Sequence, residues 1–230
     1  MNTSILYIIA TPIGNLGDIT NRAVETLQKV DLIVCEDTRT SKKLLDKYAI
    51  KTPTVSFYQF QKNKGAVKPV PKLEYIIAEI KAGKNVALIT DAGTPGISDP
   101  GNQLVARAIE NGIAVIPIPG VSALTTLASV SGIDLTKFVF LGFPPHKKGR
   151  ETFFKEVSAF NFPVIYFESP HRLIKNLELL KSLAFGKNII LGRELTKMFE
   201  EIVRGTVDEV LEYFEENKDK IKGEIVIIVY

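Results

Sequence analysis

The sequence predicts an α/β protein built from two α/β domains, and two observations lead to this prediction. Apolar runs typical of buried strands alternate with segments of helical periodicity along the whole chain. Near the middle, the stretch Pro117-Ile118-Pro119-Gly120 interrupts this alternation at the exit of a strand. We therefore expect an N-terminal domain over residues 1–117, with a mostly parallel sheet, and a C-terminal domain over residues 118–230.

The first half follows the pattern β-α-β-α-β-α-β-α-β, which is typical of a parallel sheet covered by helices. Two of its helices end next to a glycine, Gly83 or Gly112, the residue that most often closes a helix. Apolar runs place four of the five strands, near 5–10, 31–35, 86–90 and 113–116, and periodic segments place the four helices, near 21–29, 40–48, 73–82 and 102–110.

The second half alternates in the same way. Its first helix, near 122–130, is apolar or small on nearly every side, so we expect it to be buried. Strands are predicted near 138–143, 164–168, 189–192 and 224–230, and further helices near 149–158, 171–183 and 207–216.

The most informative segment is Asp91–Gly101, which follows the apolar run Val86–Thr90. It holds three glycines, two prolines and two aspartates in eleven residues, a composition that suits a rigid turn rather than a helix or strand. In open α/β sheets ligands bind beyond the carboxyl ends of the strands, where this loop is expected. The alternative is a tight connection that binds nothing. Six other strands also end in glycine, proline or charged residues, which favours a binding or catalytic edge.

Composition narrows the class of protein. The chain has 230 residues, a net charge of +3, 45% hydrophobic and 24% charged residues, as expected of a globular protein whose partner can be acidic. One cysteine, Cys35, rules out an internal disulfide, and with two histidines it argues against a metal site. No apolar run is long enough to span a membrane and no signal pattern opens the chain, so we expect a cytoplasmic protein.

Common cofactor and nucleophile motifs are missing. The first strand is not followed by G-x-G-x-x-G, which argues against a dinucleotide. There is no Walker A lysine, and no G-x-S-x-G elbow for acyl transfer. What remains is a glycine-rich strand-to-helix loop that begins with an aspartate, which could hold a small, partly charged cofactor through backbone groups.

Several charged clusters follow strands or interrupt the pattern. Glu36-Asp37-Thr38-Arg39 could be a local ion pair with a helix cap, or a catalytic or substrate-orienting cluster. Arginines after strands suit phosphate recognition, although each could equally be surface charge. Residues 59–72 contain four lysines and no acid, which indicates either a solvated loop or a flap that contacts phosphates. The candidates for phosphate contacts are Lys62, Lys64, Lys68, Arg172 and Arg193.

These clusters, in this order, resemble the ribosomal RNA small subunit methyltransferase I family of the tetrapyrrole methylase superfamily. The resemblance covers about residues 6–229. It rests on the segments Thr11–Thr20, Glu36–Arg39, Asp91–Gly101, Pro119–Ala123, Gly142–Pro144, Glu168–Arg172 and Arg193–Lys197.

The resemblance implies two α/β domains with a cleft between them that binds S-adenosylmethionine. It implies transfer of a methyl group to the ribose 2′-OH of a cytidine in the decoding region of 16S rRNA, within the small ribosomal subunit, by a homodimer. Many relatives continue into a further C-terminal segment that this chain lacks after Tyr230. A methylase of a tetrapyrrole or other small molecule, and a non-catalytic RNA-binding protein, are the alternatives.

The resemblance also suggests roles for individual residues. The candidates for orienting the hydroxyl or taking its proton are Glu36, Asp37, Arg39 and Lys197, and the sequence does not rank them. The cofactor is expected to contact Ile13, Asp91, Ala92, Gly93, Thr94, Pro95, Gly96, Val121, Ser122, Ala123, Phe167 and Leu195.

Overall fold

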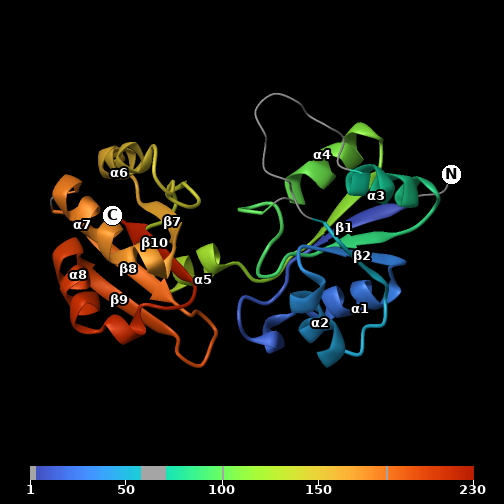
Figure 1. Ribbon diagram of the computed structural model, residues 1–230, viewed down its shortest axis with the longest axis horizontal. Coiled ribbons are helices and arrows are strands. Elements are labelled where there is room, and N and C mark those ends of the chain that lie inside the picture. The colour runs from blue at the N-terminus through green and yellow to red at the C-terminus, as the bar shows by residue number, and fades with distance from the viewer. Residues whose placement is uncertain (1–3, 58–70, 100, 185) are drawn as a thin grey trace. The chain divides into compact units, whose positions relative to one another are not determined.

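The computed structural model describes residues 4–57, 71–99, 101–184 and 186–230, which form two compact units, Met1–Ser122 and Ala123–Tyr230 (Figure 1). The division lies after Ser122 rather than after residue 117, because strand β5 (Ala114–Ile118) still belongs to the first sheet. Its last residue, Ile118, is in register with Ile9. Pro117 is tolerated there because β5 is an edge strand, where one side of the backbone needs no donor.

The first unit contains a fully parallel sheet, where the sequence predicted a mostly parallel one. Its strand order is β3-β2-β4-β1-β5, and every pairing between neighbours is parallel. The strands are short, and the inner strands β2 and β4 are buried along their whole length, as expected of a sheet covered on both sides, whereas the edge strands β3 and β5 are partly exposed. Besides β5, the strands of this sheet are β1 (Ile5–Ile9), β2 (Leu32–Cys35), β3 (Thr54–Ser56) and β4 (Val86–Leu88).

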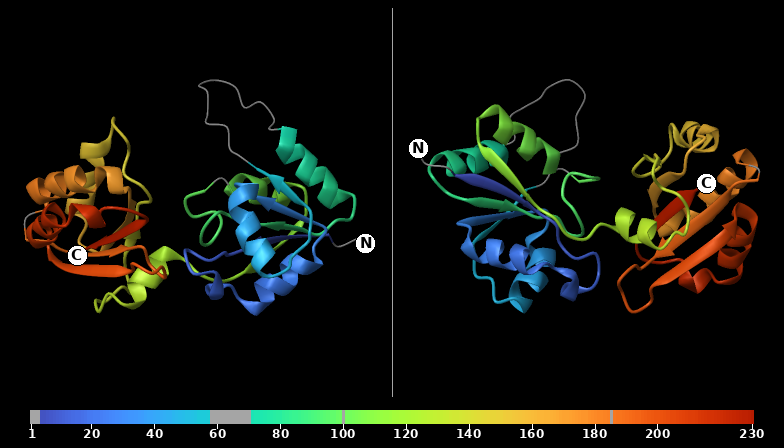
Figure 2. Two further views of the ribbon diagram at one scale, coloured as in Figure 1. Left: turned by 60° about the horizontal axis from the view of Figure 1, so that its bottom comes forward. Right: turned by 180° about the vertical axis from the view of Figure 1, so that it is seen from behind.

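Helices cover both faces of this sheet, as the views in Figures 1 and 2 show. Residues of α1 (Asn21–Lys29) and α2 (Thr38–Lys47) share one apolar cluster with the sheet, and residues of α3 (Pro71–Lys81) and α4 (Gly101–Glu110) share another. Local signals set where the helices begin: the Thr20 hydroxyl accepts a hydrogen bond from the Ala23 N–H at 3.1 Å, and Asp37 caps α2.

The second unit contains a mixed sheet with the order β6-β7-β10-β8-β9. β10 is antiparallel to both β7 and β8, and β6 is parallel to β7. The carboxyl ends of β6, β7 and β8 therefore lie at the same edge. The strands are β6 (Val139–Phe140), β7 (Val164–Glu168), β8 (Asn188–Arg193), β9 (Glu201–Thr206) and β10 (Ile225–Val229).

Helices also cover both faces of the second sheet. On one face, α6 (Arg150–Ala159), α7 (Leu173–Leu183) and α8 (Val207–Glu216) bury the largest apolar cluster of this unit. On the other, α5 (Ala123–Ser129) packs against β10, and a Cβ at Gly192 would meet its Leu127 side chain at 2.8 Å. Short 3-10 turns cover Leu16–Asp18, Pro170–Arg172 and Lys218–Lys220.

Two elements of the second unit differ from the expectation. β9 was not predicted, because its sequence Glu-Ile-Val-Arg-Gly-Thr is only half-buried at the sheet edge and lacks a strong apolar pattern. β6 covers only Val139–Phe140 of the expected 138–143. Two further backbone bonds, from Leu141 to Ile165 and from Phe167 to Gly142, continue the contact with β7 beyond the regular ladder.

Candidate functional site

Four loops leave the first sheet at one edge, because all of its strands are parallel. They follow β1, β2, β4 and β5, and they contain most of the segments that stood out in the sequence. This is the edge at which open α/β sheets bind ligands.

The loop after β4 is tied to the loop after β1. The Thr11 N–H donates to the Gly93 carbonyl at 2.9 Å, and the Gly93 N–H donates to the Thr11 carbonyl at 3.0 Å. The Thr11 hydroxyl also donates to the Thr90 carbonyl at 3.1 Å. Thr11 is buried, so these bonds are shielded from water. The loop after β4 therefore has a fixed path over β1.

The same loop is also tied to the segment that follows β5. The Thr94 hydroxyl donates to the Val121 carbonyl at 3.0 Å, and a Cβ on Gly93 would lie 3.8 Å from that carbonyl. Asp99 accepts bonds from the Gly96 N–H at 2.7 Å and the Gly101 N–H at 2.8 Å, which closes the far side of the turn. The loop thus joins the exits of three neighbouring strands.

Glycine is required at the crossing point. Gly93 has φ +82°, and a Cβ there would meet the Ile13 side chain at 3.4 Å. Gly93 and Pro95 are buried, whereas Asp91, Ala92 and Gly96 are exposed. A rigid loop therefore presents a carboxylate and backbone groups to solvent. This donor set fits a small cofactor with a charged end and hydroxyl groups.

The acidic cluster after β2 contacts this loop. The Asp37 N–H donates to Asp91 Oδ1 at 3.1 Å, across 54 positions of sequence. Asp37 Oδ1 accepts from the Arg39 N–H at 2.8 Å, and Asp37 Oδ2 lies 2.6 Å from Arg39 Nη2. Arg39 is 88% exposed at its side chain, while Asp37 is 18% exposed. The structure brings Glu36, Asp37 and Asp91 together at one strand edge.

The carboxylates of this cluster differ in acidity. Hydrogen bonds from Arg39 lower the pKa of Asp37 to about 2. Burial raises the pKa of Glu36, and the negative charges of Asp91 and Asp99 raise it further. Burial also raises the pKa of Asp91, and the charge of Asp37 adds to this effect. Of Glu36 and Asp37, Glu36 is therefore the better proton acceptor, while Asp37 is an ionised partner of Arg39.

Two arginines expected to contact RNA lie mostly inside the second unit. Arg193 is 3% exposed, and its Nη1 donates to the Phe199 carbonyl at 3.0 Å and to Glu201 Oε2 at 3.3 Å. Arg172 donates from Nη1 to the Pro144 carbonyl at 3.0 Å. The Arg193 guanidinium joins the start of β9 to the end of β8, and a phosphate contact from Arg193 or Arg172 stays a prediction.

Lys197 belongs to a second charged group, in the β8–β9 connection. Its Nζ lies 2.8 Å from Glu194 Oε1 and 3.4 Å from Glu224 Oε2. Desolvation lowers the pKa of Lys197, but the two glutamates raise it by more, so the net shift is upward. Lys197 therefore remains charged near neutral pH. A catalytic role for Lys197 stays a prediction.

The expected cofactor residues divide between the units. Ile13, Val121 and the loop of residues 91–96 come together in the first unit, with Ser122 at its end. Ala123, Phe167 and Leu195 belong to the second unit, where Leu195 is buried against Gly192 and Phe167 packs on Phe140. Their roles stay predictions. Lys62, Lys64 and Lys68 lie outside the described residues.

Two contacts in the site did not follow from sequence patterns. Thr11 reads as an ordinary turn residue, yet it bridges to Gly93. Asn176 lies in a helix and its Nδ2 donates to the buried Glu168 carboxylate at 2.7 Å. A polar residue on the apolar face of a predicted helix was the available signal for Asn176.

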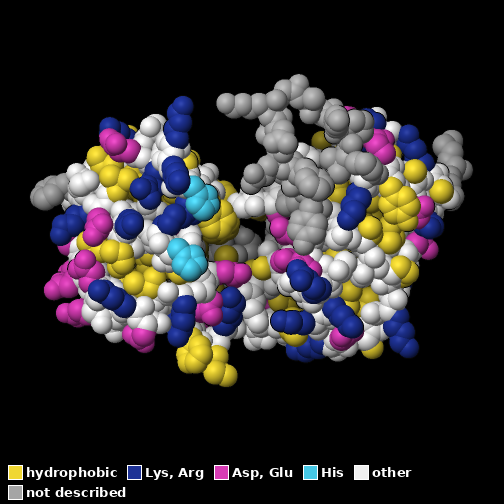
Figure 3. Space-filling model, in the orientation of Figure 1, with side chains coloured by type: hydrophobic (Ala, Val, Ile, Leu, Met, Phe, Trp, Pro, Cys, Tyr) yellow, Lys and Arg dark blue, Asp and Glu magenta, His cyan; other side chains and the backbone are white. Residues whose placement is uncertain are grey.

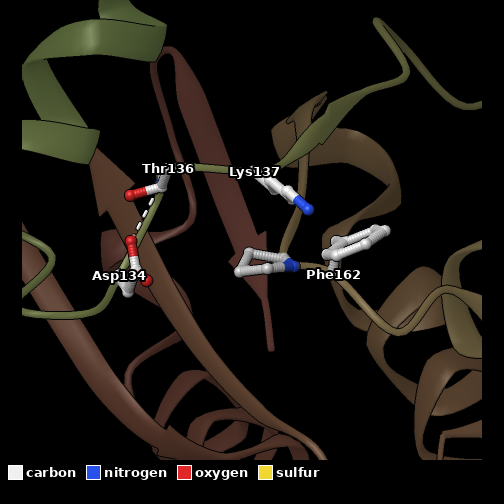
Figure 4. Close-up of a pocket in the computed structure, with 5 residues that line it drawn as sticks. Asp134, Thr136, Lys137 and Phe162 are labelled. Carbon is white, nitrogen blue, oxygen red and sulfur yellow. Dashed lines mark hydrogen bonds between the residues drawn. The ribbon is translucent and has the colours of Figure 1, made fainter.

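A pocket of about 290 Å³ lies at the opposite edge of the second sheet, before β6 and β7 (Figure 4). Its lining includes Asp134, whose carboxylate accepts from the Thr136 N–H at 2.8 Å, and Lys137, whose ammonium lies 5.7 Å from the Phe162 ring centre. These contacts complete a turn, and none of the strand-exit clusters reaches this pocket.

Among the described residues, no group of three or more His, Cys, Asp or Glu side chains could hold a metal ion. No helix in those parts of the chain is long and apolar enough to cross a membrane.

Solved structures share this fold. A cobalt precorrin-4 methyltransferase superposes with a TM-score of 0.70 at 17% identity, covering 97% of this chain and 94% of its own. A diphthine synthase superposes with a TM-score of 0.72 at 12% identity, covering 98% and 89%. At these identities the likeness shows the fold alone.

Sequence relatives are closer. The ribosomal RNA small subunit methyltransferase I of Synechocystis sp. is 44% identical over 98% of this chain and 78% of its own length. The protein of that name from Thermotoga maritima is 42% identical over 97% of both chains. A family profile for tetrapyrrole (corrin/porphyrin) methylases matches residues 5–211. The chain therefore belongs to the tetrapyrrole (corrin/porphyrin) methylase family, among relatives named ribosomal RNA small subunit methyltransferase I.

Proposed function

We propose that this chain is an S-adenosylmethionine-dependent methyltransferase that acts on the RNA of the small ribosomal subunit. The observation that carries the proposal is the contact between two strand exits. The Asp37 N–H bonds to Asp91 Oδ1, which joins an acidic cluster that can accept a proton to a glycine-rich loop that can hold a cofactor. Relatives of 42–44% identity bear the corresponding name.

The loop after β4 would hold the cofactor. Asp91 offers a carboxylate to hydroxyl or ammonium groups, and the backbone near Gly93 and Gly96 can approach closely because neither residue has a side chain. Ile13 and Val121 flank the loop from neighbouring strand exits. S-adenosylmethionine would supply a methyl group on a positively charged sulfur, already activated for transfer.

Glu36 would take the proton of the attacking hydroxyl. A ribose 2′-OH must lose its proton as the new O–CH₃ bond forms, and a carboxylate with a raised pKa accepts a proton better than an ordinary one. Asp37 would orient Arg39, whose exposed guanidinium can contact an RNA phosphate. Much of the rate would come from alignment of the hydroxyl oxygen behind the S–CH₃ bond.

The finer identity of the substrate extends this proposal. We assign the acceptor as the 2′-OH of a cytidine in the decoding region of 16S rRNA, modified in the cytoplasm by a homodimer. Lys62, Lys64 and Lys68 would add phosphate contacts, which act on affinity without reading sequence.

A methylation assay with labelled S-adenosylmethionine tests the proposal. We expect label in 16S rRNA when the protein is mixed with assembled small subunits or with naked rRNA, and nuclease digestion should release 2′-O-methylcytidine. Two outcomes would overturn the proposal: label on a tetrapyrrole but not on RNA, or RNA binding without any transfer. Glu36→Gln serves as the inactive control.

A further inference from the structure

The loop that follows β6 carries an exposed aromatic ring. Phe143 is 53% exposed, although a phenyl ring normally gains free energy from burial. Its ring centre lies 5.2 Å from that of Phe167, which in turn packs edge-on against Phe140 at 5.1 Å. One side of the Phe143 ring is therefore supported by Phe167, which is itself held by Phe140, and about half of the Phe143 side chain is open to solvent.

The same loop continues into a run of cations. His146, Lys147 and Lys148 are exposed, and no acid occurs between Phe143 and Arg150. Among the residues that the structure describes, Lys147 and Lys148 take part in no ion pair.

The nearby acids do not neutralise this surface. Glu151 already pairs with Lys155 at 2.6 Å. Glu168 is fully buried at its side chain and accepts bonds from the Ser169 N–H and from Asn176, each at 2.7 Å. Figure 3 shows the chain's two histidines on the visible face of the second unit, with lysine and arginine side chains close to them.

Two structural bonds hold the loop in place. Arg172 Nη1 donates to the Pro144 carbonyl at 3.0 Å, so the exit of β7 supports the residue next to Phe143. The Phe167 N–H donates to the Gly142 carbonyl at 2.9 Å on its other side. The aromatic ring is therefore presented from a fixed backbone, which lowers the entropy lost when a ligand stacks on it.

We propose that Phe143, Lys147 and Lys148 form a binding surface for single-stranded RNA, here named the Phe143 surface, in which Phe143 stacks on an unpaired base and the lysines contact flanking phosphates. Proteins recognise unpaired bases by stacking them on aromatic side chains and track the backbone with cations. The inference rests on the proposed function, and it assigns RNA contacts to an exposed loop of the second unit.

RNA binding without cofactor tests the Phe143 surface separately from methyl transfer. A fluorescent fragment of 16S rRNA is titrated with protein at several salt concentrations, and fluorescence anisotropy reports affinity. We expect Phe143→Ala to weaken binding by about 5- to 150-fold, the range for loss of one base–aromatic stack, with little change in salt dependence. Phe143→Tyr should restore most of the affinity.

Replacing the lysines should instead change how strongly RNA affinity depends on salt. Lys147→Gln with Lys148→Gln should reduce the slope of log affinity against log salt by about 1.4, or roughly 0.7 per phosphate contact to a single strand. The matched control is Lys51→Gln with Lys81→Gln. Both control lysines are exposed and belong to no ion pair in the described chain. They precede strands β3 and β4 of the first unit, at the edge of its sheet opposite the strand exits.

Melting temperature and S-adenosylmethionine affinity show that each variant is folded. Parental RNA affinity in Phe143→Ala together with an unchanged salt slope in the double lysine variant would overturn the Phe143 surface while leaving the proposed function intact. The Phe143 surface would also be contradicted if the Lys147/Lys148 variant changed the salt slope no more than the Lys51/Lys81 control variant does. If the parent protein methylates no RNA but binds the fragment through this surface, the proposed function fails and the surface stands.

Discussion

Thr11 and Gly93 exchange two backbone hydrogen bonds, of 2.9 and 3.0 Å, between loops that are 82 positions apart in sequence. This reciprocal pair fixes the glycine-rich loop after β4 over the exit of β1. Because Gly93 adopts a left-handed conformation, any side chain there is strained, and its Cβ would contact Ile13 at 3.4 Å.

We expect Gly93→Val to abolish S-adenosylmethionine binding measured by calorimetry. Its Cβ would enter the contact with Ile13, and a β-branched residue is strained at φ +82°. Gly112→Ala, just after the end of α4 and outside the cofactor loop, is the control: its φ is +68°, and no atom lies within 4 Å of the added Cβ. It should lose about 1–2 kcal/mol of stability from strain alone and keep cofactor affinity. Equal cofactor affinity in a folded Gly93→Val protein would contradict the placement.

Glu36→Gln should lower the rate of methyl transfer at saturating substrates by roughly 10²- to 10⁴-fold, the usual contribution of a general base. The amide keeps the shape of the side chain but accepts no proton. Cofactor affinity should stay near the parental value. Single-turnover measurements separate the chemical step from product release. Near-normal turnover in Glu36→Gln would exclude Glu36 as the base.

The pH dependence of turnover should follow Glu36. Its raised pKa places the acidic limb of the rate profile above the ordinary value of 4.5, because the protonated carboxyl cannot accept a proton. Asp91→Asn removes the largest charge that raises this pKa, while the amide oxygen can still accept the Asp37 N–H bond. The acidic limb should therefore move to lower pH. A limb that stays in place, with cofactor saturating, would assign the titration to another group.

Asp37→Asn and Arg39→Ala should both lower methyl transfer, by roughly 10²-fold or more, with cofactor affinity preserved. The amide can still cap α2 but cannot hold the guanidinium by charge. A purely structural pair would instead lower the melting temperature and leave turnover intact. Since Arg39 lowers the pKa of Asp37 from 3.8 to about 2, any stability from this pair is present above pH 3.8 and disappears as pH falls through 2. Melting temperatures measured across this pH window should show how much the Asp37–Arg39 pair contributes to stability.

Asn176→Ala should destabilise the second unit, and more at pH 8 than at pH 5. The change removes a hydrogen bond to a buried carboxylate, which costs about 1.5–3 kcal/mol. Burial raises the pKa of Glu168 and the bond from Asn176 lowers it, so loss of the bond raises it further. Ionisation then opposes folding as pH rises through the folded pKa.

Glu168→Gln with Asn176→Ala is the control for this effect, since it leaves no carboxyl to titrate at position 168. Thermal unfolding of both variants at the two pH values provides the measurement. A pH difference of the same size in both variants would point to another ionisable group.

Much of the candidate site could be predicted from local sequence. The Asp91–Gly101 composition predicted a rigid loop, and the apolar run before it predicted a strand exit. The ranking of Glu36 over Asp37 as proton acceptor could not be predicted, because it depends on the partial burial of Glu36 and on the charge of Asp91. The two residues are adjacent in sequence, and only their surroundings separate their acidities.

The sequence by itself determined the alternation of strands and helices, the parallel first sheet and the strand ends that carry polar residues. These features follow from periodicity and turn chemistry, which act over a few residues. Only the tertiary structure decided that β5 extends through Pro117 to Ile118, that β9 pairs with β8, and that Arg193 is buried. Each of these depends on pairing or burial against residues elsewhere in the fold, where long-range contacts outweigh local preference.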